Sequence, residues 1–189
     1  MNIDDTTNIK KIIIKEPCKN TLQQSQTKKI NCEKEIKMRV ETKTWGLNKE
    51  ELSHQNQLNV LLCDGFIDNN NKDKYTEKLI SHIKNKLYNY KQQDIIKKKI
   101  NEENFVSSAE TINLLKTSNL KCCYCSSDIY ILYERVREMK QWSLDRIDNN
   151  IGHNSGNLLI ACLECNLKRR RTNKDAFMFT KNMVIIKEK

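Results

Sequence analysis

Two Cys-x-x-Cys pairs constrain this chain more than any other feature of its sequence. Cys122 and Cys125 form the first pair, and Cys162 and Cys165 form the second. The two thiolates of a pair can reach one ion from a tight turn, and four thiolates close a tetrahedral zinc site. We therefore predict a structural Zn²⁺ site with these four ligands. Cys123 is a less suitable ligand than Cys122, because its spacing to Cys125 is one residue shorter.

The composition indicates why such a chain would need a metal. Only 38% of its 189 residues are hydrophobic and 31% are charged, whereas a globular chain is about 45–50% apolar. Bound zinc supplies folding free energy that a small polar core lacks. The eight cysteines and an acidic, polar start unlike a secretory signal favour metal ligation in an intracellular protein, cytoplasmic or nuclear. The sequence contains no apolar run of the length that a membrane span needs.

The charge predicts the kind of partner. A net charge of +10 favours nucleic acid, because cations that bind phosphate release counterions. A basic protein without such a partner is the alternative. Residues 163–189 hold eight Lys or Arg and three Asp or Glu, so the positive charge gathers near the end of the chain.

Three regions are expected. Residues 1–50 are polar and lysine-rich, which predicts an arm that is mostly disordered or only loosely attached. Residues 51–117 predict a mainly helical segment, with one helix capped by Asp73 and running to about Lys91. A second helix is predicted from Ser108 to about Thr117, and Ser107-Ser108-Ala109-Glu110 has the spacing of a capping box at its start. Residues 118–189 predict a small zinc-bound domain, so the fold class is α+β.

The cysteine-containing region has its own pattern. Trp142–Ile147 and Asn157–Ala161 predict two strands of a hairpin, joined by a loop that contains two of the four glycines. Leu163–Arg171 contains good helix formers and no breaker, so a helix is expected there. The predicted order is strand, loop, strand and helix, with the helix starting inside the second cysteine pair.

Several motifs of this region occur in a recognisable order. They are Cys-x-x-Cys, Asp145-Arg146-Ile147-Asp148-Asn149, Gly152-His153, Asn157 and Cys-x-x-Cys-Asn166. This series resembles the HNH, or ββα-metal (His-Me finger), endonuclease family, in the four-cysteine branch of phages and large DNA viruses. The resemblance covers about residues 118–180. It implies a zinc-held hairpin and helix, hydrolysis of DNA phosphodiester bonds, and a viral protein acting inside its host cell.

The resemblance implies that Asp145 and Asn166 bind a catalytic divalent ion. A carboxylate and an amide carbonyl are hard oxygen ligands, which suit Mg²⁺ or Mn²⁺ with several waters retained. Such an ion could stabilise the charge that develops on the leaving 3′ oxygen. Because Cys165 directly precedes Asn166, the zinc site would also hold the amide in place.

One position departs from the family pattern. Arg146 stands where most members have a histidine that activates water; arginine stays protonated and cannot be a general base, although it can bind the scissile phosphate. His153 is the first candidate for the base and Asp148 the second. A loop histidine that binds a phosphate or caps a turn is the alternative for His153. Asn157 resembles the asparagine that braces the hairpin, with a plain turn residue as its alternative.

The predicted last helix carries a basic run. It consists of Lys168, Arg169, Arg170 and Arg171. Arg170 follows Asn166 by four residues and would share its helical face. We expect the run to contact the DNA backbone without reading its sequence. A solvated face or a localisation signal is the alternative.

Three hypotheses result. The first is a metal-dependent DNA endonuclease. The second is an inactive zinc-held module that binds DNA, because the family histidine is missing beside Asp145. The third is a zinc-ribbon interaction protein, which leaves Asp145, Asn157 and Asn166 unexplained. The form of the DNA, the role of residues 1–117 and the action of a homodimer on two strands stay open.

Overall fold

The structure, a computed structural model, describes residues 11–13, 36–63, 66 and 73–186. Most of the arm predicted to be disordered over residues 1–50 therefore lies outside the described residues. Its last part has a regular structure. The 3-10 helix η1 (Val40–Thr44) precedes the buried Trp45, and the backbone N–H of Arg39 donates to the carbonyl of Glu134 at 2.8 Å. This part of the arm packs on the rest of the protein.

Three helices follow, each begun by a polar side chain that accepts a hydrogen bond from a backbone N–H of the first turn. They are α1 (His54–Leu62), α2 (Lys74–Ile96) and α3 (Ser108–Thr117), capped by Ser53, Asp73 and Ser107. The predicted start of α2 and both ends of α3 are confirmed. However, α2 continues to Ile96 rather than ending near Lys91, because the residues between them include no glycine or proline that would stop a helix.

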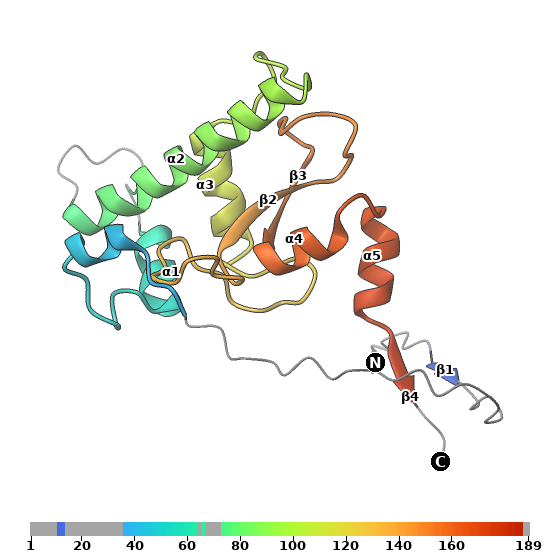
Figure 1. Cartoon of the computed structure of the whole chain (residues 1–189), viewed down its shortest axis with the longest axis horizontal. Helices are drawn as coiled ribbons and strands as arrows, with labels where there is room; N and C mark the ends of the chain where they lie inside the picture. The colour runs from blue at the N-terminus through green and yellow to red at the C-terminus, as the bar shows by residue number, and fades with distance from the viewer. Residues whose placement is uncertain (1–10, 14–35, 64–65, 67–72, 187–189) are drawn as a thin grey trace, which may run out of the picture.

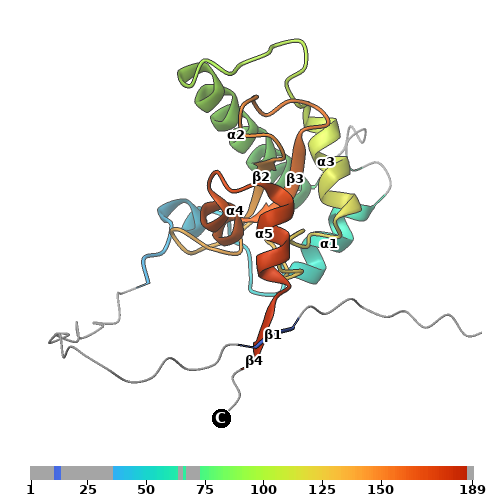
Figure 2. The ribbon, with the colours of Figure 1, turned by 90° about the vertical axis from the view of Figure 1, so that its right-hand side faces the viewer.

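An antiparallel hairpin forms the middle of the cysteine-containing region. Strand β2 (Trp142–Arg146) pairs with β3 (Leu158–Cys162), and Asp145 lies opposite Leu159. The predicted hairpin is confirmed, with boundaries one residue away from those expected. Helix α4 (Leu163–Arg169) follows β3 at once and packs on both strands, as Figures 1 and 2 show.

The last helix, α5 (Lys174–Lys181), begins behind Asn173, whose side chain accepts hydrogen bonds from two backbone N–H groups. Strand β4 (Val184–Ile186) follows and pairs in parallel with β1 (Lys11–Ile13). Figures 1 and 2 show this strand pair beyond the end of α5, apart from the hairpin. The two-stranded pair thus joins two segments from opposite ends of the sequence.

One hydrophobic core connects the helical segment to the hairpin. Leu79 and Ile83 of α2, Leu115 of α3, and Leu144 and Ile160 of the hairpin are each at most 4% exposed and belong to one cluster. The architecture is α+β, as predicted. Among the described residues, no helix has the length and apolar character that a membrane crossing requires.

Candidate functional site

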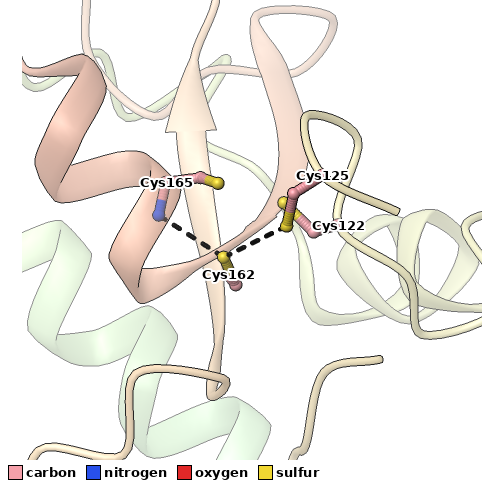
Figure 3. A group of neighbouring side chains, drawn as sticks. All are labelled: Cys122, Cys125, Cys162 and Cys165. Atoms are coloured by element: carbon pink, nitrogen blue, oxygen red, sulfur yellow. Dashed lines mark hydrogen bonds between the residues drawn. The ribbon is translucent and has the colours of Figure 1, made fainter. Parts of the chain in front are cut away.

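The four predicted zinc ligands lie together. Their sulfur atoms all lie within 4.8 Å of one another. Figure 3 shows Cys122 and Cys125 on one turn of the chain, Cys162 at the end of β3 and Cys165 at the start of α4. Four sulfurs around a zinc ion at about 2.3 Å would lie about 3.8 Å apart, and the Cys125 and Cys162 sulfurs are 3.9 Å apart. The group therefore fits a tetrahedral metal such as zinc, and Cys123 is not part of it.

Local backbone structure holds these cysteines. In the first pair, the N–H of Cys122 donates to the carbonyl of Ser127 at 3.0 Å, and Ser126 adopts a φ of 53° that turns the chain back. The N–H of Cys123 donates to the carbonyl of Ile160 at 3.0 Å, which ties this turn to β3. In the second pair, the Cys162 sulfur caps α4. These hydrogen bonds hold the turn of the first cysteine pair and helix α4 next to each other without a bound metal.

The side chain between the first two ligands reaches Asp145. The Tyr124 hydroxyl donates to Asp145 Oδ2 at 2.6 Å, and Arg169 Nη1 of α4 donates to Asp145 Oδ1 at 2.8 Å. The side chains of Asp145 and Arg169 are 4% and 1% exposed. Arg169 also donates to the carbonyls of Arg146 and Ile147. Each carboxylate oxygen of Asp145 thus already accepts a charged or strong hydrogen bond.

Burial dominates the electrostatics of this group. Removal from water raises the pKa of Asp145, although the hydrogen bond from Tyr124 and the charge of Arg169 both lower it. Burial, followed by the bond to Asp145, raises the pKa of Tyr124 above its usual range. Each oxygen of the Asp145 carboxylate keeps a second lone pair, but the side chain is only 4% exposed, so a divalent ion could bind Asp145 only if neighbouring side chains opened a path to it. The predicted metal-binding role of Asp145 therefore requires a local rearrangement.

Asn166 lies on the same face of β2 as Asp145. Its Nδ2 donates to Ser143 Oγ at 3.2 Å and to the carbonyl of Leu144 at 3.1 Å. Ser143 and Asp145 are two residues apart on a strand, so their side chains project from one face. Within the described part of the chain, no hydrogen bond to the amide oxygen of Asn166 is found, which leaves that oxygen as a potential metal ligand.

His153 is bound to a carboxylate that the sequence did not reveal. Its Nδ1 lies 3.0 Å from both carboxylate oxygens of Asp94, and its backbone N–H donates to Asp94 Oδ2 at 2.6 Å. The ring lies against Tyr90, with centroids 4.4 Å apart. His153 and Asp94 are 4% and 0% exposed. Burial lowers the pKa of His153, and the attraction of Asp94 opposes that shift.

Asp94 shapes the glycine loop as well. A Cβ atom on Gly152 would lie 2.5 Å from the carbonyl oxygen of Lys99 and 2.7 Å from Asp94 Oδ2. Only glycine therefore allows the loop to approach the end of α2 so closely. The helical spacing of Leu87, Tyr90 and Asp94 could have shown that Asp94 lies on the buried face of α2, but not that His153 is its partner.

The remaining loop residues have separate partners. Asn157 Oδ1 accepts from the N–H of Asp148 at 2.8 Å, and its Nδ2 donates to the carbonyls of Asp148 and Gly152. Asn157 therefore connects the two ends of the loop. Arg146 Nη1 donates to the carbonyl of Ile151 at 3.1 Å. Asp148 is exposed and caps the next turn by accepting from the N–H of Asn150.

The basic run does not form one continuous surface. Lys168 is exposed and pairs with Glu164 at 2.6 Å. Arg169 was expected at a DNA-facing surface, but its guanidinium is buried against Asp145, so it cannot reach a phosphate in this conformation. The helix ends at Arg169, because Arg170 adopts a φ of 52°. Arg170 therefore does not share a helical face with Asn166, contrary to the expectation.

A polar hollow of about 480 Å³ lies beside the loop and the end of α4. Arg171 lines it, together with Lys99 and Asp148. Lys99 Nζ also donates to the carbonyl of Asn149. Lys99 is a cation at this surface that no sequence pattern singles out, because it belongs to a lysine-rich stretch.

Comparison with known proteins adds no assignment: no protein-family model, no curated protein and no solved structure matches this chain.

Proposed function

We propose that this protein is a divalent-metal-dependent DNA endonuclease of the HNH type. The observation that supports it most is the common face of Asp145 and Asn166, with the hairpin and α4 joined by the four-cysteine cluster. An acid and an amide oxygen on one face are a suitable pair for Mg²⁺ or Mn²⁺. The cysteines would hold Zn²⁺ as a structural ion with no open position for substrate.

The proposed ion has a limited role. When bound, it would stabilise charge on the leaving oxygen of the scissile phosphodiester. Because Asp145 is buried, Arg169 or Tyr124 would have to move far enough to admit the ion to a carboxylate oxygen. Arg169 keeps the carbonyls of Arg146 and Ile147 as acceptors, so its displacement from Asp145 need not leave it without partners.

His153 is the group that we propose as general base, with Asp94 as its positioning residue. The carboxylate holds Nδ1, and no hydrogen bond to Nε2 is found among the described residues. Its lowered pKa keeps the ring neutral near pH 7, which is the form that can accept a proton. Asp148 is the weaker candidate, since it already accepts a backbone hydrogen bond.

The polar hollow is where we propose that the DNA backbone lies. Lys99 and Arg171 supply cations there, and the chain carries a net charge of +10. Contacts of this kind would bind phosphates without reading sequence. Lys168 of α4 and Arg170, directly after this helix, are exposed and would extend the contact.

The burial of Asp145 favours a second candidate function, DNA binding without cleavage. If Arg169 and Tyr124 keep both carboxylate oxygens, the same module would bind DNA through its cations and would not cleave it. The predicted behaviour is retention of DNA that weakens steeply with salt, with no nicking by any divalent ion.

A plasmid-nicking assay separates the two functions. The zinc-loaded full chain would be transferred by gel filtration into buffer without divalent ions, because a chelator would attack both metal sites. We expect nicking only after addition of Mg²⁺ or Mn²⁺. We also expect at least about a hundredfold loss of nicking in Asp145→Asn and in Asn166→Ala, in line with removal of one transition-state contact.

Controls make the result specific. Asp175→Asn removes a carboxylate that is 84% exposed and should nick as the wild type does. Each variant is checked for zinc content and for its circular dichroism spectrum, and Asn166→Ala decides the question if Asp145→Asn is unfolded. Equal nicking by the wild type and a folded Asn166→Ala variant would contradict the nuclease proposal. DNA binding without nicking would support the second function.

A further inference from the structure

A second cavity, of about 390 Å³, lies away from the cysteine cluster and the glycine loop. One wall is a polar face of α2, and the others come from the segment around η1, from Ile131 and Tyr133, and from the start of β2. The α2 residues on this wall are His82, Asn85, Lys86 and Asn89. Their spacing places them on one face of the helix. No predicted catalytic or cysteine residue lines this cavity.

Arg39 lines the cavity with half of its guanidinium unpaired. Its Nη2 is bound to Glu41 Oε2 at 2.7 Å, and its carbon Cζ lies 4.7 Å from the ring centroid of Tyr133. Its Nη1 is buried and has no hydrogen-bond partner among the described residues. A buried donor without a partner is unfavourable. The guanidinium is thus fixed by stacking and one ion pair, while its other arm lacks an acceptor.

Lys86 is the second cation of the cavity. Its Nζ donates to Gln141 Oε1 at 2.8 Å and to the carbonyl of Trp142, and it lies 4.9 Å from the ring centroid of Trp142. An ammonium has three N–H groups, and these bonds use two. No carboxylate pairs with Lys86 in the described part of the chain. Burial, followed by the charge of Arg39, lowers the pKa of Lys86 to about 7.

The balance of charge in this cavity favours an anion. Two cations, Arg39 and Lys86, share it with one carboxylate, and the Glu41 side chain is 69% exposed. In the absence of a ligand, each cation makes the charged form of the other less favourable by repulsion. An anion that entered between them would accept hydrogen bonds from both, and it would favour the charged form of Lys86.

We propose that this cavity binds a phosphoryl group, with Arg39 and Lys86 as its charged ligands and Asn85 and Asn89 as neighbouring amide donors. The unpaired Nη1 arm of the guanidinium would donate to a phosphate oxygen, and the ammonium supplies a point charge. The volume leaves space for more than the anion, so the phosphoryl group can belong to free phosphate or to a nucleotide. The proposal does not depend on nuclease activity.

Isothermal titration calorimetry on the zinc-loaded full chain tests the site, with inorganic phosphate, adenosine monophosphate and adenosine as probes. We expect both phosphoryl compounds to bind and adenosine not to bind. Tighter binding of the nucleotide would identify a nucleotide site, and equal binding a site for the free anion. Lys86→Met should weaken binding at least about tenfold. Lys84→Met, which alters an exposed lysine of the same helix, should leave it unchanged.

A measurement on the wild type avoids any effect of substitution on folding. The side-chain titration of Lys86 can be followed by nuclear magnetic resonance with and without phosphate, and we expect its pKa to rise from about 7 when phosphate is bound. The proposal is overturned if neither phosphoryl compound binds, if adenosine binds equally well, if Lys86→Met binds as the wild type does, or if the Lys86 titration does not move.

Discussion

Two buried carboxylates, Asp145 and Asp94, differ in the basic side chain that each one pairs with. Asp145 is bound to Arg169, which stays charged at every accessible pH. Asp94 is bound to His153, which can lose its proton near neutral pH. Arg169 therefore remains a cation beside Asp145, whereas His153 can be the neutral hydrogen-bond partner of Asp94 without any movement of its atoms.

The two carboxylates also depend on different parts of the fold. Asp145 is connected through Tyr124 to the turn between the first two cysteines. Asp94 lies on α2, outside the cysteine region, and reaches the loop through His153 and Gly152. We therefore expect the four-cysteine cluster to stabilise the position of Asp145 directly and that of Asp94 only indirectly. Under the proposed function, the proton-accepting role would belong to the pair of Asp94 and His153.

Removal of zinc should have the largest effect on the stability of the fold. Structural zinc contributes about 10–16 kcal/mol in zinc-finger peptides, comparable to the entire stability of a domain, about 5–15 kcal/mol. We expect the hairpin and α4 to unfold when a strong chelator removes the metal, or in Cys162→Ser. Hydrogen exchange measured by mass spectrometry should show loss of protection around Asp145 before loss in α2 near Asp94.

The matched control is Cys63→Ser, because Cys63 is exposed and lies outside the four-cysteine group. It should bind one zinc and keep the protection of the wild type. Unchanged protection of β2 in a sample shown to contain no zinc would contradict this prediction, and with it the dependence of Asp145 on the cluster.

A charge-removing substitution at each carboxylate should have the next largest effect. Asp145→Asn leaves Arg169 buried beside a neutral group, and breaking one side of a buried ion pair costs about 3–5 kcal/mol. Asp94→Asn leaves a histidine that can remain neutral, so the expected cost is that of an impaired hydrogen bond, about 1–3 kcal/mol. Urea unfolding of the zinc-loaded proteins measures both free energies.

The double variant Asp145→Leu with Arg169→Met sharpens this result. Replacing both members of a buried pair by apolar residues is often neutral, so the double variant should recover most of the stability that Asp145→Asn loses. If Asp94→Asn proved as costly as Asp145→Asn, the proposed distinction between a permanent and a titratable cation would be wrong.

The parts of this molecule that the sequence predicted are those fixed by local pattern. Ser107 caps α3 at the predicted residue, and the four cysteines converge as their spacing indicated. Such features depend on residues a few positions apart. Even here a tertiary contact intervenes: the Glu110 carboxylate, expected to complete the capping box, instead accepts from the Ser155 hydroxyl at 2.7 Å.

The pairing of buried charges could not be predicted in this way. Arg169 belongs to a run of four basic residues, a pattern typical of a solvated face, yet its partner Asp145 lies on a strand that only the folded hairpin brings near. Asp94 and His153 are joined across α2 and the loop. Burial of a charge depends on which side chains surround it in three dimensions, and neither spacing nor composition contains that information.

The smallest expected effect is the pH dependence of the Asp94 pair. Because burial lowers the pKa of His153 below its ordinary value of 6.5, the unfolded chain binds more protons than the folded one as the pH falls through about 6.5. Stability should therefore be constant above this pH and decrease below it, by about 1.4 kcal/mol for each pH unit, until the pH passes the pKa of the folded state. The raised pKa of Asp145 gives the opposite sign.

His82, whose pKa burial lowers to about 4, contributes in the same direction, so the measurement must resolve individual histidines. Titration of the His153 ring by nuclear magnetic resonance should give a midpoint below 6.5. In Asp94→Asn the midpoint should fall further, because the attraction of the carboxylate is removed. A His153 midpoint well above its ordinary value would make this histidine a permanent cation at neutral pH, as Arg169 is. It would then hold its proton where a general base must accept one, and the contrast between the two carboxylates would disappear.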